Sequence, residues 1–98
     1  MRSLEKWQQI VTNYAIEHGF DWNKNDVDIM LLRLHSEVSE AAEAVRDEDW
    51  KGFAEELADI FIRLVNIAEV MEVDLEIEIE KKHQINLTRP KLHGRKRK

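Results

Sequence analysis

Apolar residues recur every three or four positions along most of the chain, a spacing that predicts amphipathic helices. A first helix is predicted to begin after Ser3, a good N-cap residue, with Gly19 placed to cap its end. A second is predicted over about residues 27–46 and a third over about 53–71, joined by the short connection DEDWKG. The predicted core faces are, in order, Leu4, Trp7, Val11 and Tyr14; Val27, Leu31, Leu34, Val38, Ala41 and Val45; and Phe53, Leu57, Ile60, Phe61, Leu64, Ala68 and Met71.

The fourth segment, VDLEIEIEKKHQINLTRP, carries two conflicting patterns. Its LEIEIE stretch alternates apolar and acidic residues, which is typical of a strand. A single strand in an otherwise helical chain has no partner for its backbone hydrogen bonds, however, and Asp74 is a good N-cap. We therefore expect a fourth helix, which ends before Pro90.

These elements predict an all-α fold, a four-helix bundle-like single domain over residues 1–98 with a basic tail at 89–98. The third helix is apolar around most of its circumference, because Ile62 and Val65 lie off its main stripe. A chain of 98 residues can hardly cover such a helix on all sides. The surplus predicts a homo-oligomer, either a dimer or a tetramer.

Composition narrows the class of protein. The chain has no cysteine, which excludes disulfides and thiolate metal sites. No apolar run is long enough to span a membrane, and the first residues, MRSLEKWQQI, lack the apolar core of a signal peptide. We therefore expect a cytoplasmic protein without a membrane partner.

Charge is divided unevenly along the chain. The net charge is -5, yet every acid lies at or before Glu80, and residues 89–98 hold six of the fifteen Lys and Arg. An acidic body with a basic tail suits a body that binds cations and a tail that meets phosphates. The alternative is a tail that only keeps the protein in solution.

Two acid pairs stand beside the apolar stripes of consecutive helices. HSEVSEAAEA holds Glu37 and Glu40, and EELADI holds Glu56 and Asp59. Acids three positions apart share one helix face, so two such pairs on packed antiparallel helices can surround a cation with oxygens. Mg²⁺ and Mn²⁺ prefer such ligands. Either pair alone is more often a solvated helix face.

Two other metal sites fit less well. The loop from Asp21 resembles a calcium-binding loop, but Asp26 stands where glycine is needed and Leu32 where a bidentate glutamate is needed. A di-iron bundle needs Glu-x-x-His on each of two helices, and only Glu80 and His83 have that spacing.

The order of these motifs resembles the all-α nucleoside triphosphate pyrophosphohydrolases, the MazG and dCTP pyrophosphatase group. The resemblance covers about residues 30–96 and includes the context LHSEVSEAAEAVRD and EELADIFIRLVNIAEVMEVDL. It rests on Glu37-x-x-Glu40, then Glu56-x-x-Asp59, then a K…N..RP..HG.K pattern formed by Lys82, Asn86, Arg89-Pro90, His93-Gly94 and Lys96.

The resemblance implies hydrolysis of a nucleoside triphosphate between its α and β phosphates, for nucleotide-pool house-cleaning. Glu37, Glu40, Glu56 and Asp59 then match the catalytic positions that hold Mg²⁺, with Mn²⁺ a possible substitute. Either Glu37 or Glu40 is expected to orient the attacking water as general base.

Substrate-binding residues are expected outside the acids. Lys82 and Arg89 are candidates for the phosphates, and Asn86 for phosphate or base. The list is completed by Asn66, either as a ligand or phosphate contact or as a helix amide satisfied by a neighbour; His35, which either contacts the base or packs; and Trp22, as a stacking residue in the loop.

A different class of function also fits the sequence. The chain can be read as a helical oligomerisation or regulatory module whose basic tail binds nucleic acid or an acidic partner. Such a module tolerates neutralisation of the acids, whereas a metal site does not. Nothing in the sequence identifies a preferred base or sugar.

Overall fold

A computed structural model describes residues 1–90, so positions 91–98, which include His93, Gly94, Lys96 and most of the predicted basic tail, lie outside the described part. The helices are α1 (Leu4–Glu17), α2 (Val27–Arg46), α3 (Trp50–Val70) and α4 (Leu75–Leu87), with a short 3-10 turn, η1 (Lys24–Asp26), before α2. The described residues contain no strand, which confirms the all-α prediction. None of the described helices has the length and hydropathy of a membrane span.

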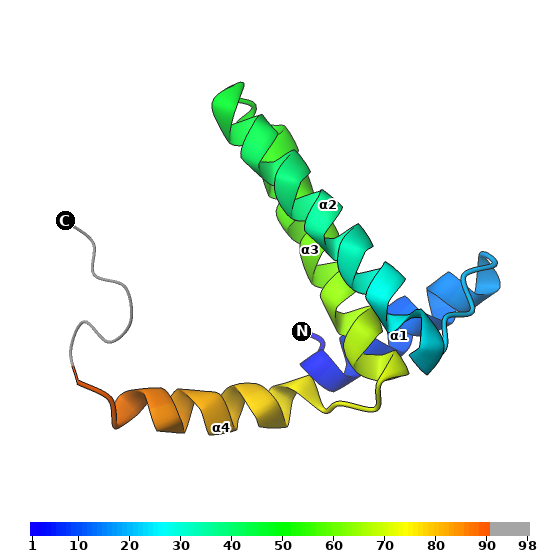
Figure 1. Ribbon diagram of the computed structural model, residues 1–98, viewed down its shortest axis with the longest axis vertical. Coiled ribbons are helices and arrows are strands. Elements are labelled where there is room, and N and C mark those ends of the chain that lie inside the picture. The colour runs from blue at the N-terminus through cyan, green and yellow to red at the C-terminus, as the bar shows by residue number, and fades with distance from the viewer. Residues whose placement is uncertain (91–98) are drawn as a thin grey trace.

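The helices form a long antiparallel hairpin with two further helices at its base. α2 and α3 run side by side, α1 packs across the lower part of α3, and α4 extends from the base away from the hairpin (Figure 1). The radius of gyration is 15.8 Å, against about 12–13 Å for a compact chain of this length. The described chain is therefore open in shape, with α4 as a projecting arm.

Helix starts follow the capping residues. Ser3 Oγ accepts the backbone N–H of Lys6 at 3.1 Å, as predicted for α1. Asp49 Oδ1 accepts that of Gly52 at 3.0 Å, so α3 begins at Trp50, three residues earlier than predicted. The connection between α2 and α3 is correspondingly short.

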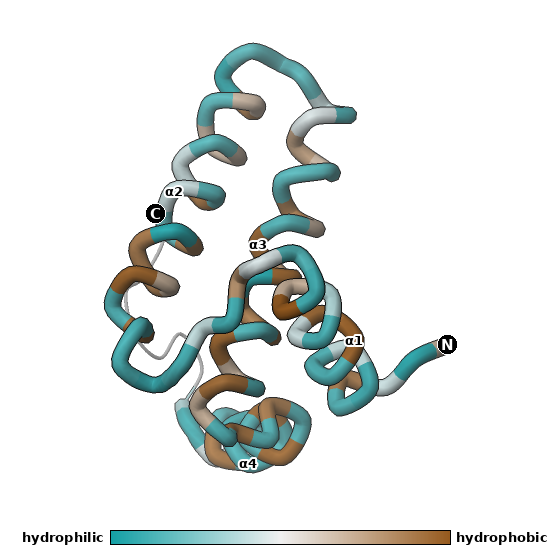
Figure 2. The backbone as a smooth tube through the Cα atoms, turned by 90° about the vertical axis from the view of Figure 1, so that its right-hand side faces the viewer, coloured by the Kyte–Doolittle hydropathy of each residue, from teal (hydrophilic) through white to brown (hydrophobic). Residues whose placement is uncertain are grey.

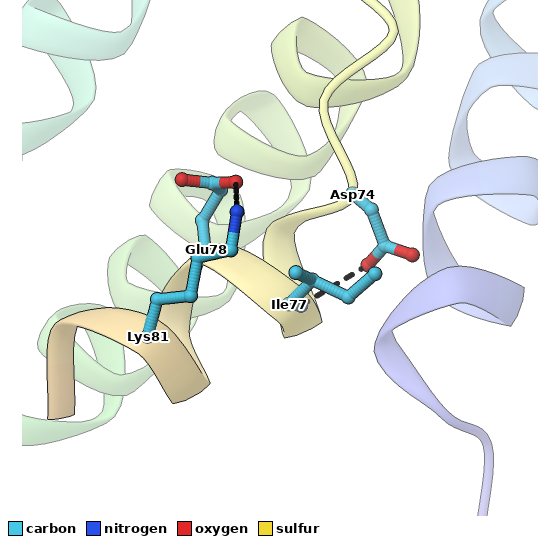
Figure 3. Close-up of polar contacts among 4 residues, drawn as sticks. All are labelled: Asp74, Ile77, Glu78 and Lys81. Atoms are coloured by element: carbon cyan, nitrogen blue, oxygen red, sulfur yellow. Dashed lines mark hydrogen bonds and ion pairs between the residues drawn. The ribbon is translucent and has the colours of Figure 1, made fainter. Parts of the chain in front are cut away.

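The fourth segment forms the helix α4, as predicted. Its N-cap, Asp74, favours a helix despite the strand-like alternation of LEIEIE. Asp74 Oδ1 accepts the Ile77 N–H at 3.2 Å, and Lys81 pairs with Glu78 at 3.5 Å one turn further on (Figure 3). Local hydrogen bonds satisfy backbone groups that a lone strand would leave unpaired.

The loop between α1 and α2 is fixed by its own polar side chains. Gly19 has φ +88°, a left-handed conformation that favours glycine, and it follows the last turn of α1 as predicted. Asn23 Oδ1 accepts the Asn25 N–H at 2.8 Å, and Asp26 Oδ2 accepts the Asn23 N–H at 2.9 Å. Asp26 therefore precedes α2, and its carboxylate caps the loop rather than α2.

The packed face of α2 differs from the predicted stripe. Leu31, Val38 and Val45 are exposed, and on α3 Leu57 and Leu64 are also exposed. The buried and half-buried positions of α2 are Val27, Met30, Leu34, Glu37, Ala41 and Ala44. These positions repeat at helical spacing, so the true packed face lies beside the predicted one and includes a glutamate.

Few apolar side chains are fully buried. The described chain buries six hydrophobic residues, Val11, Met30, Ala41, Val65, Ile67 and Ala68, and leaves eighteen large ones exposed. Brown hydrophobic positions are frequent in the lower half of α3, where α1 and α4 meet it, whereas the tip of the hairpin is mostly hydrophilic (Figure 2). A monomer with so small a core and so much exposed apolar surface is poorly stabilised.

A buried glutamine joins the helices at the base. Gln8 is 4% exposed, and its Nε2 donates to Glu69 Oε1 at 3.2 Å and to the Val73 carbonyl at 3.1 Å. Its Oε1 accepts the Leu75 N–H at 3.2 Å. One side chain of α1 thus holds the end of α3 and the start of α4, and so fixes the direction in which α4 leaves the hairpin.

Candidate functional site

Three carboxylates meet between α2 and α3. Glu37 of α2 and Glu56 and Asp59 of α3 each offer an oxygen, and these oxygens all lie within 4.8 Å of one another. Glu37 and Glu56 are half-buried, and Asp59 is exposed. Glu40, the fourth predicted acid, is exposed and lies outside this group of oxygens, next to Glu37. The structure therefore brings three of the four predicted acids together and places the fourth at their edge.

The residues beside Glu37 determine how closely α2 and α3 can approach each other. Glu37 stands on the packed face of α2, where Leu34 precedes it and the buried Ala41 follows it by about one turn. The small side chain of Ala41 leaves room for α3 beside the carboxylates. The acids are thus held at the helix interface rather than on an open face.

Arg63 of α3 binds this cluster directly. Its Nε donates to Glu37 Oε1 at 2.9 Å, and the two side chains are 33% and 13% exposed. Burial by itself raises the pKa of Glu37, but hydrogen bonds with Glu56, Arg63 and Glu40 outweigh it and hold that pKa below its ordinary value. Glu37 is therefore ionised and accepts charge-assisted hydrogen bonds.

The pKa values of the neighbouring acids, Glu56 and Glu40, are raised instead. A hydrogen bond to Glu37, then desolvation, then the charges of Glu40, Glu37 and Asp59 raise the pKa of Glu56 to about 7. The pKa of Glu40 is also raised, first by its hydrogen bond to Glu37 and then by that group's charge. Without a bound cation, the cluster relieves its repulsion by keeping protons.

One oxygen of the cluster lacks a partner altogether. Glu56 Oε2 is shielded from solvent, and no donor among the described residues reaches it. A buried acceptor without a hydrogen bond is costly, and such an atom needs an explanation. A divalent cation coordinated by the carboxylates would satisfy it, so the residues present fit a hard, oxygen-preferring metal ion.

A pocket of about 530 Å³ opens beside the acids, between α1, the loop, α2 and α3. Asp59 and Arg63 form one end of it. The full lining is Ile10, Val11, Tyr14, Ala15, Phe20, Trp22, Arg33, Asp59, Ile62, Arg63 and Asn66. Its size and mainly apolar lining with a few polar groups are those of a small-molecule site.

Aromatic rings form the loop side of this pocket. Phe20 and Trp22 stack with ring centroids 5.9 Å apart and an interplanar angle of 24°. The guanidinium carbon of Arg33 lies 5.8 Å from the centroid of Phe20 and 5.6 Å from that of Trp22. Trp22 lines the pocket, and its role in stacking on a planar ligand group stays a prediction.

The other predicted binding residues divide into two groups. Asn66 is 9% exposed and lines the pocket, and Thr12 Oγ1 donates to its Oδ1 at 2.9 Å. His35 is exposed on α2 and is not part of the pocket lining, so it is not packed within the described chain.

Lys82, Asn86 and Arg89, the predicted phosphate-binding residues, belong to α4 and the residues just after it. Arg89 Nη1 donates to Asn86 Oδ1 at 3.3 Å, and α4 runs away from the hairpin that holds the acids (Figure 1). The described chain does not bring these residues to the carboxylates.

Sequence reasoning assigned no role to Arg63, Arg33, Phe20 or Thr12. Arg63 follows Asp59 by four positions, so its place on the same face of α3 was visible in the spacing. The other three depend on how the loop and α1 fold against α3, which no local pattern reports.

Comparison with known families agrees with this geometry. The family model of the MazG nucleotide pyrophosphohydrolase domain matches residues 26–98, about three quarters of the chain. Searches of curated proteins and of solved structures found no match. The matched span contains all four predicted acids and the C-terminal K…N..RP pattern. The chain belongs to the MazG nucleotide pyrophosphohydrolase domain family.

Proposed function

We propose that the protein is a Mg²⁺-dependent nucleoside triphosphate pyrophosphohydrolase, which cleaves the bond between the α and β phosphates to give a monophosphate and pyrophosphate. The observation that carries this proposal is the junction of three converging carboxylates with an aromatic-lined pocket. A triphosphate whose base lies in the pocket extends its phosphates towards the acids, because Asp59 belongs to both features.

Glu37, Glu56 and Asp59 would hold the metal, with Glu40 at the edge of the site. Bound Mg²⁺ offsets the charge of the phosphates and lowers the pKa of an attacking water. Mn²⁺ prefers the same oxygen ligands and is a possible substitute. Glu40 is the better candidate for the general base, because Glu37 is engaged by Arg63 whereas Glu40 is exposed and has a raised pKa.

Trp22 and Phe20 would receive the base by stacking, and Arg33 would cover the stack. Arg63 has its Nε fixed on Glu37, which leaves its terminal amino groups to face the pocket it lines. A guanidinium in this position suits an oxygen-rich ligand. The biological role proposed for this activity is house-cleaning of the nucleotide pool.

We infer that two copies complete the site. The arm α4 exposes Ile77, Ile79, Ile85 and Leu87 at about half of their surface or more, although the Gln8 hydrogen bonds fix where it begins. A second chain can cover these residues together with the exposed apolar face of α2 and α3. Its α4 would then bring cationic Lys82 and Arg89 towards an acidic body that must bind a polyanion.

The alternative, a helical regulatory module with a basic tail, has no described feature that favours it over the enzyme. The substrate panel that tests the enzyme contains canonical and modified triphosphates in Mg²⁺ and in Mn²⁺, with pyrophosphate and single phosphate measured separately. Pyrophosphate release from at least one member is expected. Absence of turnover on the whole panel, or release of single phosphate, refutes the proposal.

Sedimentation tests the second copy separately. We expect a dimer or larger at micromolar concentration, and the paired substitution of Ile79 and Ile85 by glutamine should shift the protein towards monomer. A wild-type monomer at that concentration contradicts completion of the site by a second chain.

A further inference from the structure

The pocket holds an asymmetric set of polar groups at the end that lies beside Asn66. Arg33, Arg63 and the Asn66 amide nitrogen can only donate hydrogen bonds. Asp59, the one carboxylate in the lining, belongs to the acid cluster. Apart from Asp59, the charged and amide side chains of the lining therefore present hydrogen-bond donors to a ligand.

Asn66 is the buried member of this set. It is 9% exposed, and it lines both the main pocket and a small cavity next to it, formed with Trp22, Met30, Arg33 and Arg63. The small cavity holds about 10 Å³, which is no more than about one water-sized sphere. The amide thus lies at the inner wall of the pocket, where a ligand edge rather than bulk solvent would meet it.

Thr12 is the hydrogen-bond partner of this amide in the structure. Its Oγ1 donates to Asn66 Oδ1 at 2.9 Å, across from α1 to α3. The amide oxygen is therefore occupied, and Nδ2 donates no hydrogen bond to any described residue. A donor at the pocket wall without a partner among the described residues is available to an acceptor on a ligand.

The two arginines are also held in place. Arg63 Nε is bound to Glu37 at 2.9 Å, and the Arg33 guanidinium lies over the rings of Phe20 and Trp22. A fixed donor discriminates better than a mobile one, because it cannot turn away from a mismatched group.

We propose that the pocket selects nucleobases that present an oxo group over the matching bases that present an amino group. Asn66 Nδ2 reads the oxo group, and Thr12 is a positioning residue that orients the Asn66 amide. This rests on the proposed function, because it assumes that the pocket receives the base of the triphosphate. An amino group at this position would face another donor and leave both unsatisfied.

The test compares triphosphates that differ in one such group. dUTP and dCTP form one pair, and ITP and ATP the other. We expect kcat/KM to be about 10- to 100-fold higher for the oxo member of each pair, the range of one buried, unsatisfied hydrogen-bonding group. Equal values, or higher values for the amino members, overturn the inference.

Variants of Thr12 separate its orienting role from simple packing. Thr12→Val removes the hydroxyl, so the amide can turn, and the oxo-to-amino ratio should fall by about tenfold, mainly through KM. Thr12→Ser keeps the hydroxyl and should restore the ratio. An unchanged ratio in Thr12→Val contradicts the role of Thr12.

Asn66→Asp provides an independent variant, because it replaces the donor by an acceptor while Thr12 can still donate to it. The oxo-to-amino ratio should fall below that of the wild type, and an unchanged ratio contradicts the role of Asn66.

A binding measurement without chemistry distinguishes this inference from the proposed function. Calorimetric titration of UMP and CMP into the full-length protein, without metal, should show tighter binding of UMP. If this preference holds while no triphosphate is hydrolysed, the pocket inference stands and the proposed function fails. If triphosphates are hydrolysed without preference and UMP and CMP bind equally, the proposed function stands and the inference fails.

Discussion

The two halves of α3 are built for different purposes. Its first half carries Glu56 and Asp59 at the interface with α2, where like charges are held close together. Its second half contains the run Val65–Ala68, in which every residue is buried, and Val65 is fully buried. Packing against α1 therefore stabilises one end of the helix, while the other end is held in an arrangement that only a cation or protons can neutralise.

This difference predicts that substitutions in the two halves have opposite consequences. Changes among the acids should remove function and leave the fold intact or more stable. Changes of the apolar members of the buried run, Val65, Ile67 and Ala68, should lower stability and leave the activity of each folded molecule unchanged.

The largest effect is expected for the acids. Glu56→Gln and Asp59→Asn should each reduce kcat by about a hundredfold to a thousandfold, because each removes a charged ligand from the metal site. Steady-state pyrophosphate release measures this effect, and circular dichroism checks the fold. Glu55→Gln is the matched control, since Glu55 is the exposed neighbour of Glu56. Comparable activity in Glu55→Gln and Glu56→Gln would remove the acid cluster from the mechanism.

Mg²⁺ should stabilise the folded protein through the first half of α3. At a free concentration about a hundred times Kd, binding to the native state alone adds about 2.7 kcal/mol to the free energy of unfolding. Thermal melts with Mg²⁺ and with EDTA measure the shift in Tm. Glu56→Gln should lose most of this shift and Glu55→Gln none of it; an equal shift in both proteins means that Mg²⁺ binds elsewhere.

Val65→Ala should weaken only the packing of the second half of α3. Removal of two methyl groups from a fully buried side chain leaves a small cavity and costs about 2 kcal/mol of stability. Urea unfolding gives the loss, and kcat measured well below the transition should match the wild type. A large drop in kcat with native stability would show that the two halves are not independent.

The pH dependence of stability is the smallest expected effect. The pKa of Glu56 is raised from its ordinary 4.5 to about 7, so between these values the folded state holds a proton that the unfolded state has released. The free energy of unfolding of the metal-free protein should therefore fall as the pH rises from about 4.5 to about 7. Glu40, whose pKa is also raised, contributes with the same sign.

Glu56→Gln should flatten this fall, as measured by Tm in EDTA across the same range of pH. A wild-type Tm that rises steadily through the range contradicts the raised pKa. Glu37, whose pKa is lowered, has the opposite sign, and its contribution is lost only as the pH falls below the range of an ordinary carboxyl group.

The sequence predicted the helices well because caps and breaks are local. Ser3, Asp74 and the bounds of α2 were predicted correctly, and the start of α3 was wrong only because the cap at Asp49 went unnoticed. The packed faces were harder to predict. Two apolar stripes lie side by side on α2, and the pattern cannot tell which of them meets α3 and which is left exposed.

For the site too, features set by neighbouring positions in the sequence could be predicted, and features set by tertiary packing could not. Acid spacing grouped four carboxylates, since three positions along a helix fix a shared face, and three of them converge while Glu40 lies at their edge. The pocket wall could not be predicted, because Thr12, Phe20 and Arg33 meet Asn66 and Trp22 only through the packing of α1 and its loop. The role of Lys82, Asn86 and Arg89 stays a prediction, because α4 runs away from the hairpin that holds the acids.

The central claim is that the acid cluster cuts one particular bond. Phosphorus NMR of the products tests it most directly, with the triphosphate that the panel turns over fastest, in the wild type, Glu55→Gln and Glu56→Gln. We expect equal amounts of monophosphate and pyrophosphate from the first two proteins and almost none from the third. Diphosphate with single phosphate, or undiminished turnover in Glu56→Gln, would contradict it.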